Sequence, residues 1–95
     1  MNPCIVLVEA SATIRRAVEI ALAQLGHPLV AVTDANAALE VIEKRPTLLV
    51  ITASRLEGID GYSLARRLAE DPSTGHLPII LLLPRNERFD EQKAG

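Results

Sequence analysis

Four short runs of apolar residues alternate with segments in which apolar residues recur every three or four positions. The runs span residues 4–8, 28–32, 48–52 and 78–83, and none of them alternates apolar with polar side chains. Unbroken apolar runs of this length are typical of strands covered on both faces, as in parallel sheets. We therefore predict four strands, each followed by a helix, in one parallel α/β sheet.

Capping and stop residues mark the helices between these runs. Ser11, Asp34 and Asp60 each precede a segment of helical periodicity, as N-cap residues do. Gly26 and Pro46 stand where the first two helices should end. The order of elements is therefore strand and helix in strict alternation.

For the first and the last helix, the sequence also predicts individual residue contacts. Asn86 is expected to cap a last helical turn or two, in which Phe89 is the main apolar residue. The apolar stripe of the first helix is expected to face the sheet through Ile14, Val18, Ala21 and Leu25.

The composition limits the classes of protein to consider. The chain has 95 residues, of which 48% are apolar, so it suffices for one small globular domain over residues 1–95. The net charge is −2 and Lys and Arg are scattered evenly, so we predict no nucleic-acid surface. Cys4 is the only cysteine, which excludes an internal disulfide and a cysteine-based zinc site. No apolar segment approaches the ~20 residues that span a bilayer, so we expect a cytoplasmic protein without a membrane partner.

Six features in the right order resemble the receiver (CheY-like) domain of two-component response regulators. They are the exit of the first strand, the spacing of the first two helices, and the segments SATIRR, RLEGIDGYSLARRL, DPSTGHLPII and NERFDEQKAG. The resemblance implies a flavodoxin-like parallel sheet of strand order 2-1-3-4, which a fifth strand and helix would continue. The sequence ends before that fifth strand.

The resemblance also implies a phosphorylation site. In a working receiver, two acidic residues after the first strand hold Mg²⁺ beside a phosphate-accepting aspartate at the end of the third strand. A Ser or Thr ends the fourth strand, and a Lys ends the fifth. The carboxylate is the nucleophile, the cation shields phosphoryl charge, and the hydroxyl and ammonium groups then detect the phosphate.

Matched to this pattern, the chain lacks most of the required groups. Glu9 keeps the first acidic position, whereas the second is Ala10. The acceptor position falls on Ala53, or on Thr52 if the loop is one residue longer, and neither supplies a carboxylate. The hydroxyl position falls on Leu83. We therefore predict a vestigial phosphorylation pocket, no catalytic residue, a lost Mg²⁺ site and no other cofactor.

These losses favour a phosphorylation-independent pseudo-receiver, a protein-protein interaction module of two-component-type signal transduction that is not an enzyme. Its partner would be a signalling protein. Candidate residues for the partner surface are Arg15 and Arg16, on the helix that resembles the face by which receivers meet their kinases, together with Phe89. Glu9 is expected to be solvated or paired with an arginine such as Arg55.

Two alternatives stay open at this point. The chain could phosphorylate itself through a displaced acceptor such as Glu9, Thr52 or Asp60. It could instead be the N-terminal regulatory receiver of a longer multidomain response regulator. Without a fifth strand, residues 79–83 would form an exposed apolar edge, so we expect either a fragment of a longer protein or a homodimer through the strand-four edge or the fourth helix.

Overall fold

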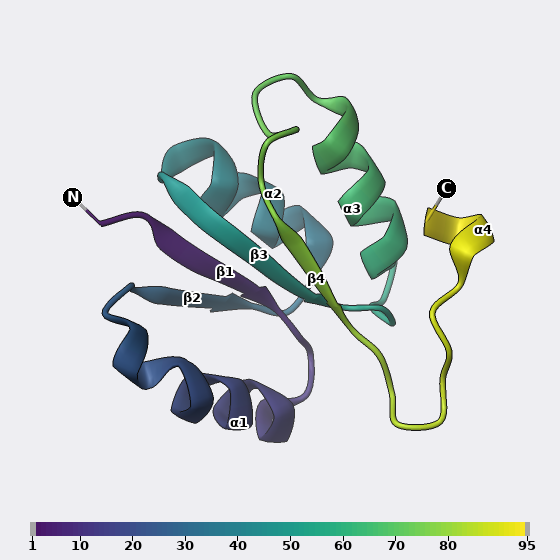
Figure 1. The fold of residues 1–95 in the computed structure, drawn as a ribbon, viewed down its shortest axis with the longest axis horizontal. Helices are drawn as coiled ribbons and strands as arrows, with labels where there is room; N and C mark the ends of the chain where they lie inside the picture. Colours follow the sequence, from purple (N-terminus) through teal and green to yellow (C-terminus); the bar gives the residue numbers. More distant parts are fainter. Residues whose placement is uncertain (1, 95) are drawn as a thin grey trace.

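The four predicted apolar runs form the four strands of one sheet in the computed structural model, which describes residues 2–94 (Figure 1). In chain order the elements are β1 (Cys4–Val8), α1 (Ala12–Leu22), a 3₁₀ turn η1 (Ala23–Leu25), β2 (Leu29–Val32), α2 (Ala35–Lys44), β3 (Thr47–Ala53), α3 (Gly61–Glu70), β4 (Ile79–Leu82) and α4 (Glu91–Ala94). Strands and helices therefore alternate as predicted.

The sheet is parallel throughout, in the order β2-β1-β3-β4, which confirms the predicted topology. Val8 at the end of β1 pairs with Val32 on one side and with Thr52 on the other, and Ala53 pairs with Leu82. The carboxyl ends of all four strands thus meet at one edge of the sheet, where ligands bind in folds of this kind.

The helices cover the two faces of the sheet unequally. Figure 1 shows α1 alone on one face and α2 and α3 on the other. All five residues of β1 are buried, because this strand lies inside the sheet with helices on both sides. On the α2/α3 face, buried strand residues pack with Ala35 and Ala38 of α2 and with Leu64 and Leu68 of α3. This face holds the larger part of the core.

The predicted N-caps are confirmed. The side chains of Ser11, Asp34 and Asp60 each accept a hydrogen bond from the backbone N–H three residues later, at 3.3, 2.8 and 2.8 Å. Gly26, with a φ of 76°, ends η1 in the left-handed region that glycine adopts without strain.

The predicted stripe of α1 is wrong at three of its four positions. Val18 packs against the sheet beside Leu22, whereas Ile14 and Leu25 are 45% and 55% exposed and Ala21 is also exposed. The 3₁₀ turn that follows α1 has three residues per turn, so Leu25 rotates off the helical face. The contact of α1 with the sheet is consequently narrow.

The predicted cap of the last helix is also wrong. Asn86 lies in a turn closed by the segment's own backbone, and α4 begins only at Glu91. Asp90 caps it, since its Oδ1 accepts hydrogen bonds from two backbone N–H groups of the first turn at 3.0 and 3.1 Å. Phe89 precedes the helix and packs on the ring of Tyr62 instead.

β4 is an edge strand that pairs only with β3 among the strands of residues 2–94. Its Ile80 side chain is 47% exposed, and Leu82 is half-buried against the α1 face. Within the same residues, no helix has both the length and the apolar character that crossing a membrane requires.

Candidate functional site

The chain leaves β1 through Glu9 and Ala10, the two positions matched to acidic metal ligands. Glu9 is buried, and its Oε1 accepts a hydrogen bond from the backbone N–H of Ser11 at 3.0 Å. Its backbone N–H donates to the carbonyl oxygen of Val32 at 3.0 Å. The expectation that Glu9 is solvated or paired with Arg55 is therefore wrong, because its carboxylate closes the turn that leads into α1. Ala10 is exposed and carries no ligand atom.

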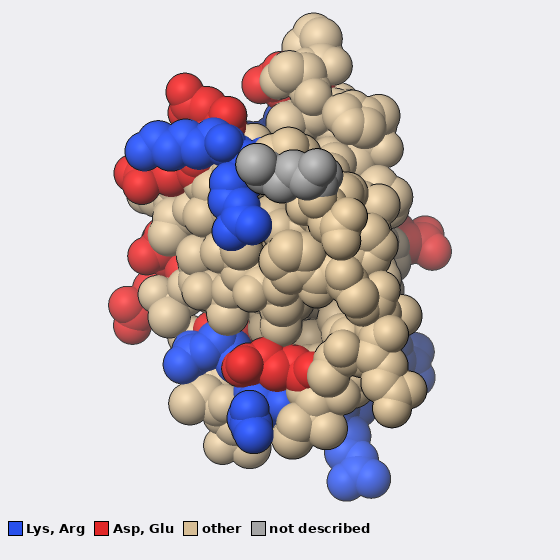
Figure 2. Space-filling view, turned by 90° about the vertical axis from the view of Figure 1, so that its left-hand side faces the viewer, with Lys and Arg blue, Asp and Glu red and all other residues tan. Residues whose placement is uncertain are grey.

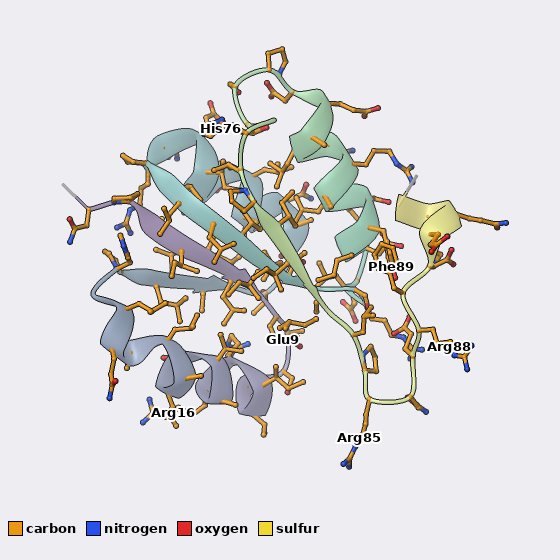
Figure 3. The ribbon with its side chains drawn as sticks, in the orientation of Figure 1. Glu9, Arg16, His76, Arg85, Arg88 and Phe89 are labelled. Carbon is orange, nitrogen blue, oxygen red and sulfur yellow. The ribbon has the colours of Figure 1, made fainter. Side chains whose placement is uncertain are left out.

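Arg15 holds this turn from the side of α1. Its Nη1 donates to the carbonyl oxygens of Glu9 and Ala10, at 3.0 and 3.1 Å. Arg16, by contrast, is exposed and points away from the domain (Figure 3). Of the two arginines that we predicted for a partner surface, Arg15 is thus engaged within the chain and Arg16 faces solvent.

β3 ends in Thr52 and Ala53, the two alternatives for the acceptor position. Thr52 is fully buried between Val8 and Leu81 of the neighbouring strands, and its hydroxyl donates to the carbonyl oxygen of Ala53 at 3.0 Å. Ala53 is the last residue of β3 and presents a nearly buried methyl group. The hydroxyl of Thr52 is directed into its own backbone, so neither position offers a nucleophile to solvent.

Asp60, one of the displaced acceptors considered from the sequence, serves as the cap of α3. The backbone N–H of Ser63 donates to its Oδ1 at 2.8 Å and lowers the pKa of the carboxyl below its ordinary value. The Ser63 hydroxyl and the charges of Lys93 and Arg66 lower this pKa further, against the opposing effect of burial. A carboxylate held in this way is oriented toward the helix.

Leu83 follows β4 directly, at the position matched to a hydroxyl. It is half-buried, and its side chain has no hydrogen-bonding atom. The backbone N–H of Ser54 donates to the carbonyl oxygen of Leu82 at 3.0 Å, which joins the exits of β3 and β4. This edge of the sheet is therefore closed by backbone contacts and apolar side chains.

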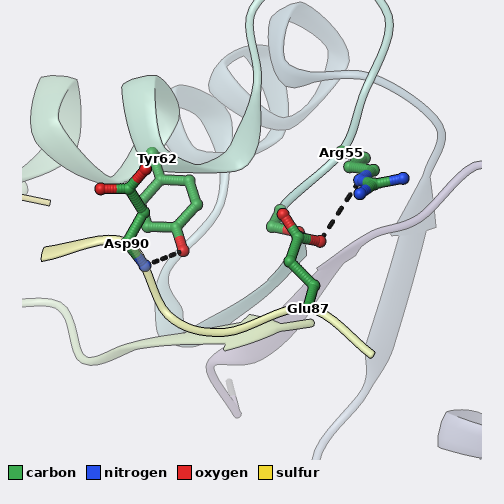
Figure 4. A network of polar contacts seen from close by, with 5 residues as sticks. Arg55, Tyr62, Glu87 and Asp90 are labelled. Carbon is green, nitrogen blue, oxygen red and sulfur yellow. Dashed lines mark hydrogen bonds and ion pairs between the residues drawn. The ribbon is translucent and has the colours of Figure 1, made fainter. Parts of the chain in front are cut away.

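The segment after β4 folds back over the end of β3 (Figure 4). Glu87 reaches this point: its Oε2 accepts a hydrogen bond from the Ser54 hydroxyl at 3.3 Å and lies 3.3 Å from Nε of Arg55. The backbone N–H of Asp90 donates to the Tyr62 hydroxyl on α3 at 2.8 Å. A carboxylate from the chain thus does lie at this edge, but it comes from a position that the sequence did not single out.

Glu87 and Tyr62 are the residues that sequence reasoning missed. The only available signal was that Tyr62 and Phe89 are the two aromatic residues of the chain. Their ring centroids lie 5.6 Å apart in a tilted arrangement, and Nζ of Lys93 lies 5.8 Å from the Tyr62 centroid. These contacts fix the segment after β4 against α3.

A cleft of about 540 Å³ opens between the exits of β1, β2 and β3. It carries two carboxylates, of Asp34 and Glu57, and that of Asp34 is used in capping α2. No cationic side chain lines this cleft, so it is poorly suited to a phosphoryl group. Its lining consists of Ala10, Thr33, Asp34, Ala35, Asn36, Glu57, Gly58 and Ile59.

A larger cleft, of about 710 Å³, lies at the opposite, amino edge of the sheet, near His76. Its lining combines apolar side chains of α2 and α3 with Arg45 and Arg67 and with Glu43 and Asp71. Backbone and side-chain hydrogen bonds from Ser73 lower the pKa of the Asp71 carboxyl. Although this cleft is larger, the candidate site lies at the carboxyl edge, because open parallel sheets bind their ligands at the carboxyl ends of the strands.

The five residues of the vestigial pocket, Glu9, Ala10, Thr52, Ala53 and Leu83, do not fit a Mg²⁺ site. Protein-bound Mg²⁺ is held by one or two carboxylates together with water and substrate phosphate. Glu9 is the only acid of the vestigial pocket, and it is hydrogen-bonded to the backbone of Ser11. Among residues 2–94, no three His, Cys, Asp or Glu side chains gather into a possible metal site.

Charged side chains of both signs lie near one another on the face that Figure 2 draws, beside large uncharged areas. Figure 2 shows Lys and Arg interspersed with Asp and Glu on this face, without a stripe of one sign. Nucleic-acid surfaces usually show such a basic stripe. That this segment does not bind nucleic acid stays a prediction.

Comparison with known proteins gives one consistent family. The family model of the response regulator receiver domain matches residues 5–94. "Transcriptional regulatory protein AfsQ1" of Streptomyces coelicolor is 37% identical over 93% of this chain and 38% of its own length. "Phosphate regulon transcriptional regulatory protein PhoB" of Pseudomonas aeruginosa is 34% identical over 87% of this chain and 36% of its own. The chain spans well under half the length of these relatives.

Solved structures agree with this result. A putative response regulator from Chloroflexus aurantiacus superposes with a TM-score of 0.84 at 28% identity, over 92% of this chain and 71% of that chain. The chemotaxis response regulator CheY4 of Vibrio cholerae has a TM-score of 0.83 at 18% identity, over 98% and 78% of the two chains. The second likeness concerns the fold alone.

Proposed function

The chain belongs to the response regulator receiver domain family, and from this premise we propose that it is a pseudo-receiver, which acts without phosphorylation as an interaction module of two-component signalling. Receiver domains interact with histidine kinases and other signalling proteins, and in general they are not themselves enzymes. The proposal assigns this chain the binding role of a receiver and not the phosphoryl transfer.

The observation that carries the proposal is the absence of a nucleophile at the end of β3. Ala53 has no reactive group, and the buried Thr52 hydroxyl donates to a backbone carbonyl oxygen. Ala10 and Leu83 likewise replace the second acidic residue and the hydroxyl of a working receiver. Because the carboxylate of Glu9 is also held by a backbone N–H, we propose that the chain binds no Mg²⁺ and requires no cofactor.

The contacts of the displaced acids argue against self-phosphorylation. A carboxylate nucleophile must present a free oxygen in line with the phosphodonor. Oε1 of Glu9 and Oδ1 of Asp60 instead accept backbone hydrogen bonds at 3.0 and 2.8 Å, which orient these carboxylates toward the starts of α1 and α3. These two carboxylates stabilise the starts of α1 and α3, which supports the proposal that the chain acts without phosphorylation.

The length of the relatives favours a second candidate, in which this segment is the receiver of a longer regulator. The transcriptional regulators from Streptomyces coelicolor and Pseudomonas aeruginosa extend far beyond the matched region. A pseudo-receiver joined to an output domain would regulate it through a bound partner. In both candidates the receiver binds a signalling partner without being phosphorylated. Only in the second candidate does that binding also regulate an attached output domain.

We also propose self-association through the edge of β4 or through α4. Within residues 2–94, β4 has a strand partner on one side only, and its Ile80 side chain is 47% exposed. Unpaired apolar edges of this kind favour pairing with another chain. Sedimentation equilibrium over a hundredfold range of concentration tests this, and a monodisperse monomer throughout would contradict it.

Intact-mass measurement tests the central proposal. The protein is incubated with Mg²⁺ and acetyl phosphate, beside a conventional receiver as the positive control. We expect an unchanged mass for this chain and a phosphoryl adduct on the control. An adduct on this chain would overturn the proposal, and its mapping would identify the side chain that accepts the phosphoryl group.

A further inference from the structure

We infer that residues 85–89, called here the basic loop, are a docking surface for an acidic segment of a partner protein that also carries an apolar side chain. This inference rests on the proposed function and specifies the chemistry of the partner. Its foundation is the combination of two exposed arginines, one exposed aromatic ring and a loop backbone that is already fixed.

The arginines supply the charge. Arg85 and Arg88 are exposed, and their side chains extend away from the domain in Figure 3. In the part of the chain that the structure describes, neither guanidinium group has a hydrogen-bond or ion-pair partner. The acid between them, Glu87, is turned inward to Ser54 and Arg55. The loop therefore presents positive charge on a chain whose net charge is −2.

Phe89 supplies the apolar contact. It is 50% exposed, and its other side rests on the ring of Tyr62, with 5.6 Å between the ring centroids. Tyr62 is itself 3% exposed and anchored in α3, so the Phe89 ring is supported from behind. Aromatic residues and arginine are both enriched at protein interfaces, and Phe89 follows Arg88 directly in the chain.

The loop is fixed before any partner arrives. Glu87 ties its middle to the end of β3 through the Ser54 hydroxyl and the Arg55 guanidinium, both at 3.3 Å. Asp90 ties its end to the Tyr62 hydroxyl at 2.8 Å (Figure 4). The Glu87 backbone N–H also donates to the Pro84 carbonyl oxygen at 2.9 Å. A fixed loop loses less conformational entropy on binding, which strengthens the complex.

The charge pattern favours a protein segment over a nucleic acid. Proteins that track a nucleic-acid backbone neutralise several phosphates along a groove. The basic loop offers two unpaired arginines and lies next to Asp90 and Glu91. Two arginines match two or three carboxylates of an extended peptide, with an apolar side chain against Phe89.

A peptide titration tests the inference. The probe is a fluorescein-labelled decapeptide that carries four Glu or Asp residues around one Leu and one Phe, and its fluorescence anisotropy is followed at low salt. We expect saturable binding to the full chain. The charge-reversal variant Arg85→Glu/Arg88→Glu should weaken it by about tenfold or more, and Phe89→Ala by about fivefold. Lys44→Glu/Arg45→Glu, the matched control at the amino edge of the sheet, should leave it unchanged.

Glu87→Ala distinguishes a fixed loop from simple charge attraction. This substitution removes a negative charge, so simple electrostatics predicts tighter binding of the acidic probe. If Glu87 orders the loop, binding weakens by about threefold or more instead, because the peptide must then order the loop itself. Circular dichroism of each variant verifies that the domain is folded.

The inference would be overturned by no saturable binding, by equal weakening by the control pair, or by equally tight binding of a labelled single-stranded oligonucleotide. Self-association that blocks the probe and is abolished by Phe89→Ala would also overturn it, since a second copy would then be the occupant. None of these outcomes bears on the intact-mass experiment. Failure of the docking surface and failure of the pseudo-receiver proposal are therefore separable.

Discussion

A Cβ atom on Gly61 would lie 2.0 Å from the carbonyl oxygen of Ala53. The other nearest atoms, at 2.9 and 3.0 Å, also belong to the backbone of Ala53 and Ser54, so no side chain can rotate to make room. The Gly61 N–H donates to the Ser54 carbonyl oxygen at 3.0 Å. The first turn of α3 is thus attached to the end of β3 at a position that admits only glycine.

Gly61→Ala should therefore lower the free energy of unfolding by about 2–3 kcal/mol, the upper range for overpacking. Gly75→Ala is the matched control, because its added Cβ would approach two carbonyl oxygens only to 3.2 and 3.3 Å. Urea denaturation of both variants gives the comparison. Equal losses in the two variants would contradict the close approach of α3 to β3.

Asp60→Ala should cost about 1 kcal/mol at neutral pH, as the loss of an N-cap does. The hydrogen bond from the Ser63 backbone N–H lowers the pKa of Asp60, so the native state binds this proton less readily than the unfolded state. The stabilisation is therefore present above the ordinary value of 3.8 and is lost as pH falls below it.

Asp60→Asn provides the control, because asparagine caps a helix about as well as aspartate and does not titrate. Its unfolding free energy, measured by urea denaturation from pH 7 to pH 2.5, should fall less steeply below pH 4 than that of the original chain. Parallel curves would show that the Asp60 carboxylate contributes nothing to the acid sensitivity of the fold.

The sequence predicted those features whose physical cause is local. Each N-cap, such as Asp34, bonds a group three residues away, and the buried strand β1 is uniformly apolar. Leu25 left the predicted stripe of α1 because it lies in a 3₁₀ turn, Ala23–Leu25, which changes the helical period. Ile14 and Ala21 lie inside the regular helix and are exposed nonetheless, so helical spacing alone did not show which apolar residues of α1 contact the sheet.

For the proposed vestigial pocket, the sequence shows which side chains stand at the matched positions. Ala10, Ala53 and Leu83 carry neither a carboxylate nor a hydroxyl, and the assignment of these positions stays a prediction. The contact of Glu87 with Ser54, 33 residues apart, depends on how the segment after β4 returns over the sheet. Such a return is set by tertiary packing, which short-range patterns do not encode.

Cys4 should react with a thiol reagent only after the fold opens. It has no exposed surface, and β1 lies between β2 and β3 in the sheet. Native protein should thus react with Ellman's reagent at least about a thousandfold more slowly than protein in urea. Ala12→Cys, which adds an exposed thiol on α1, should label rapidly in the native state, and equally rapid labelling of Cys4 would contradict the burial of β1.

Restoring two carboxylates should restore a response to Mg²⁺. Ala10 and Ala53 follow β1 and end β3, two adjacent strands, and Glu9 lies beside them. In Ala10→Asp/Ala53→Asp, three acids would crowd this edge, so the variant should be less stable without metal. Mg²⁺ at 100 times its dissociation constant would then stabilise the variant by about 2.7 kcal/mol.

For a domain of this size, that energy corresponds to a rise of about 10 °C or more in Tm, measured by differential scanning fluorimetry. The original chain should shift by less than about 1 °C under the same conditions, because Glu9 is hydrogen-bonded to Ser11 and neither Ala10 nor Ala53 supplies a second carboxylate. Ca²⁺ and Na⁺ at equal ionic strength separate metal binding from screening. A Tm increase of the original chain with Mg²⁺ would show that other groups bind the ion, and the loss of the site would then have to be abandoned.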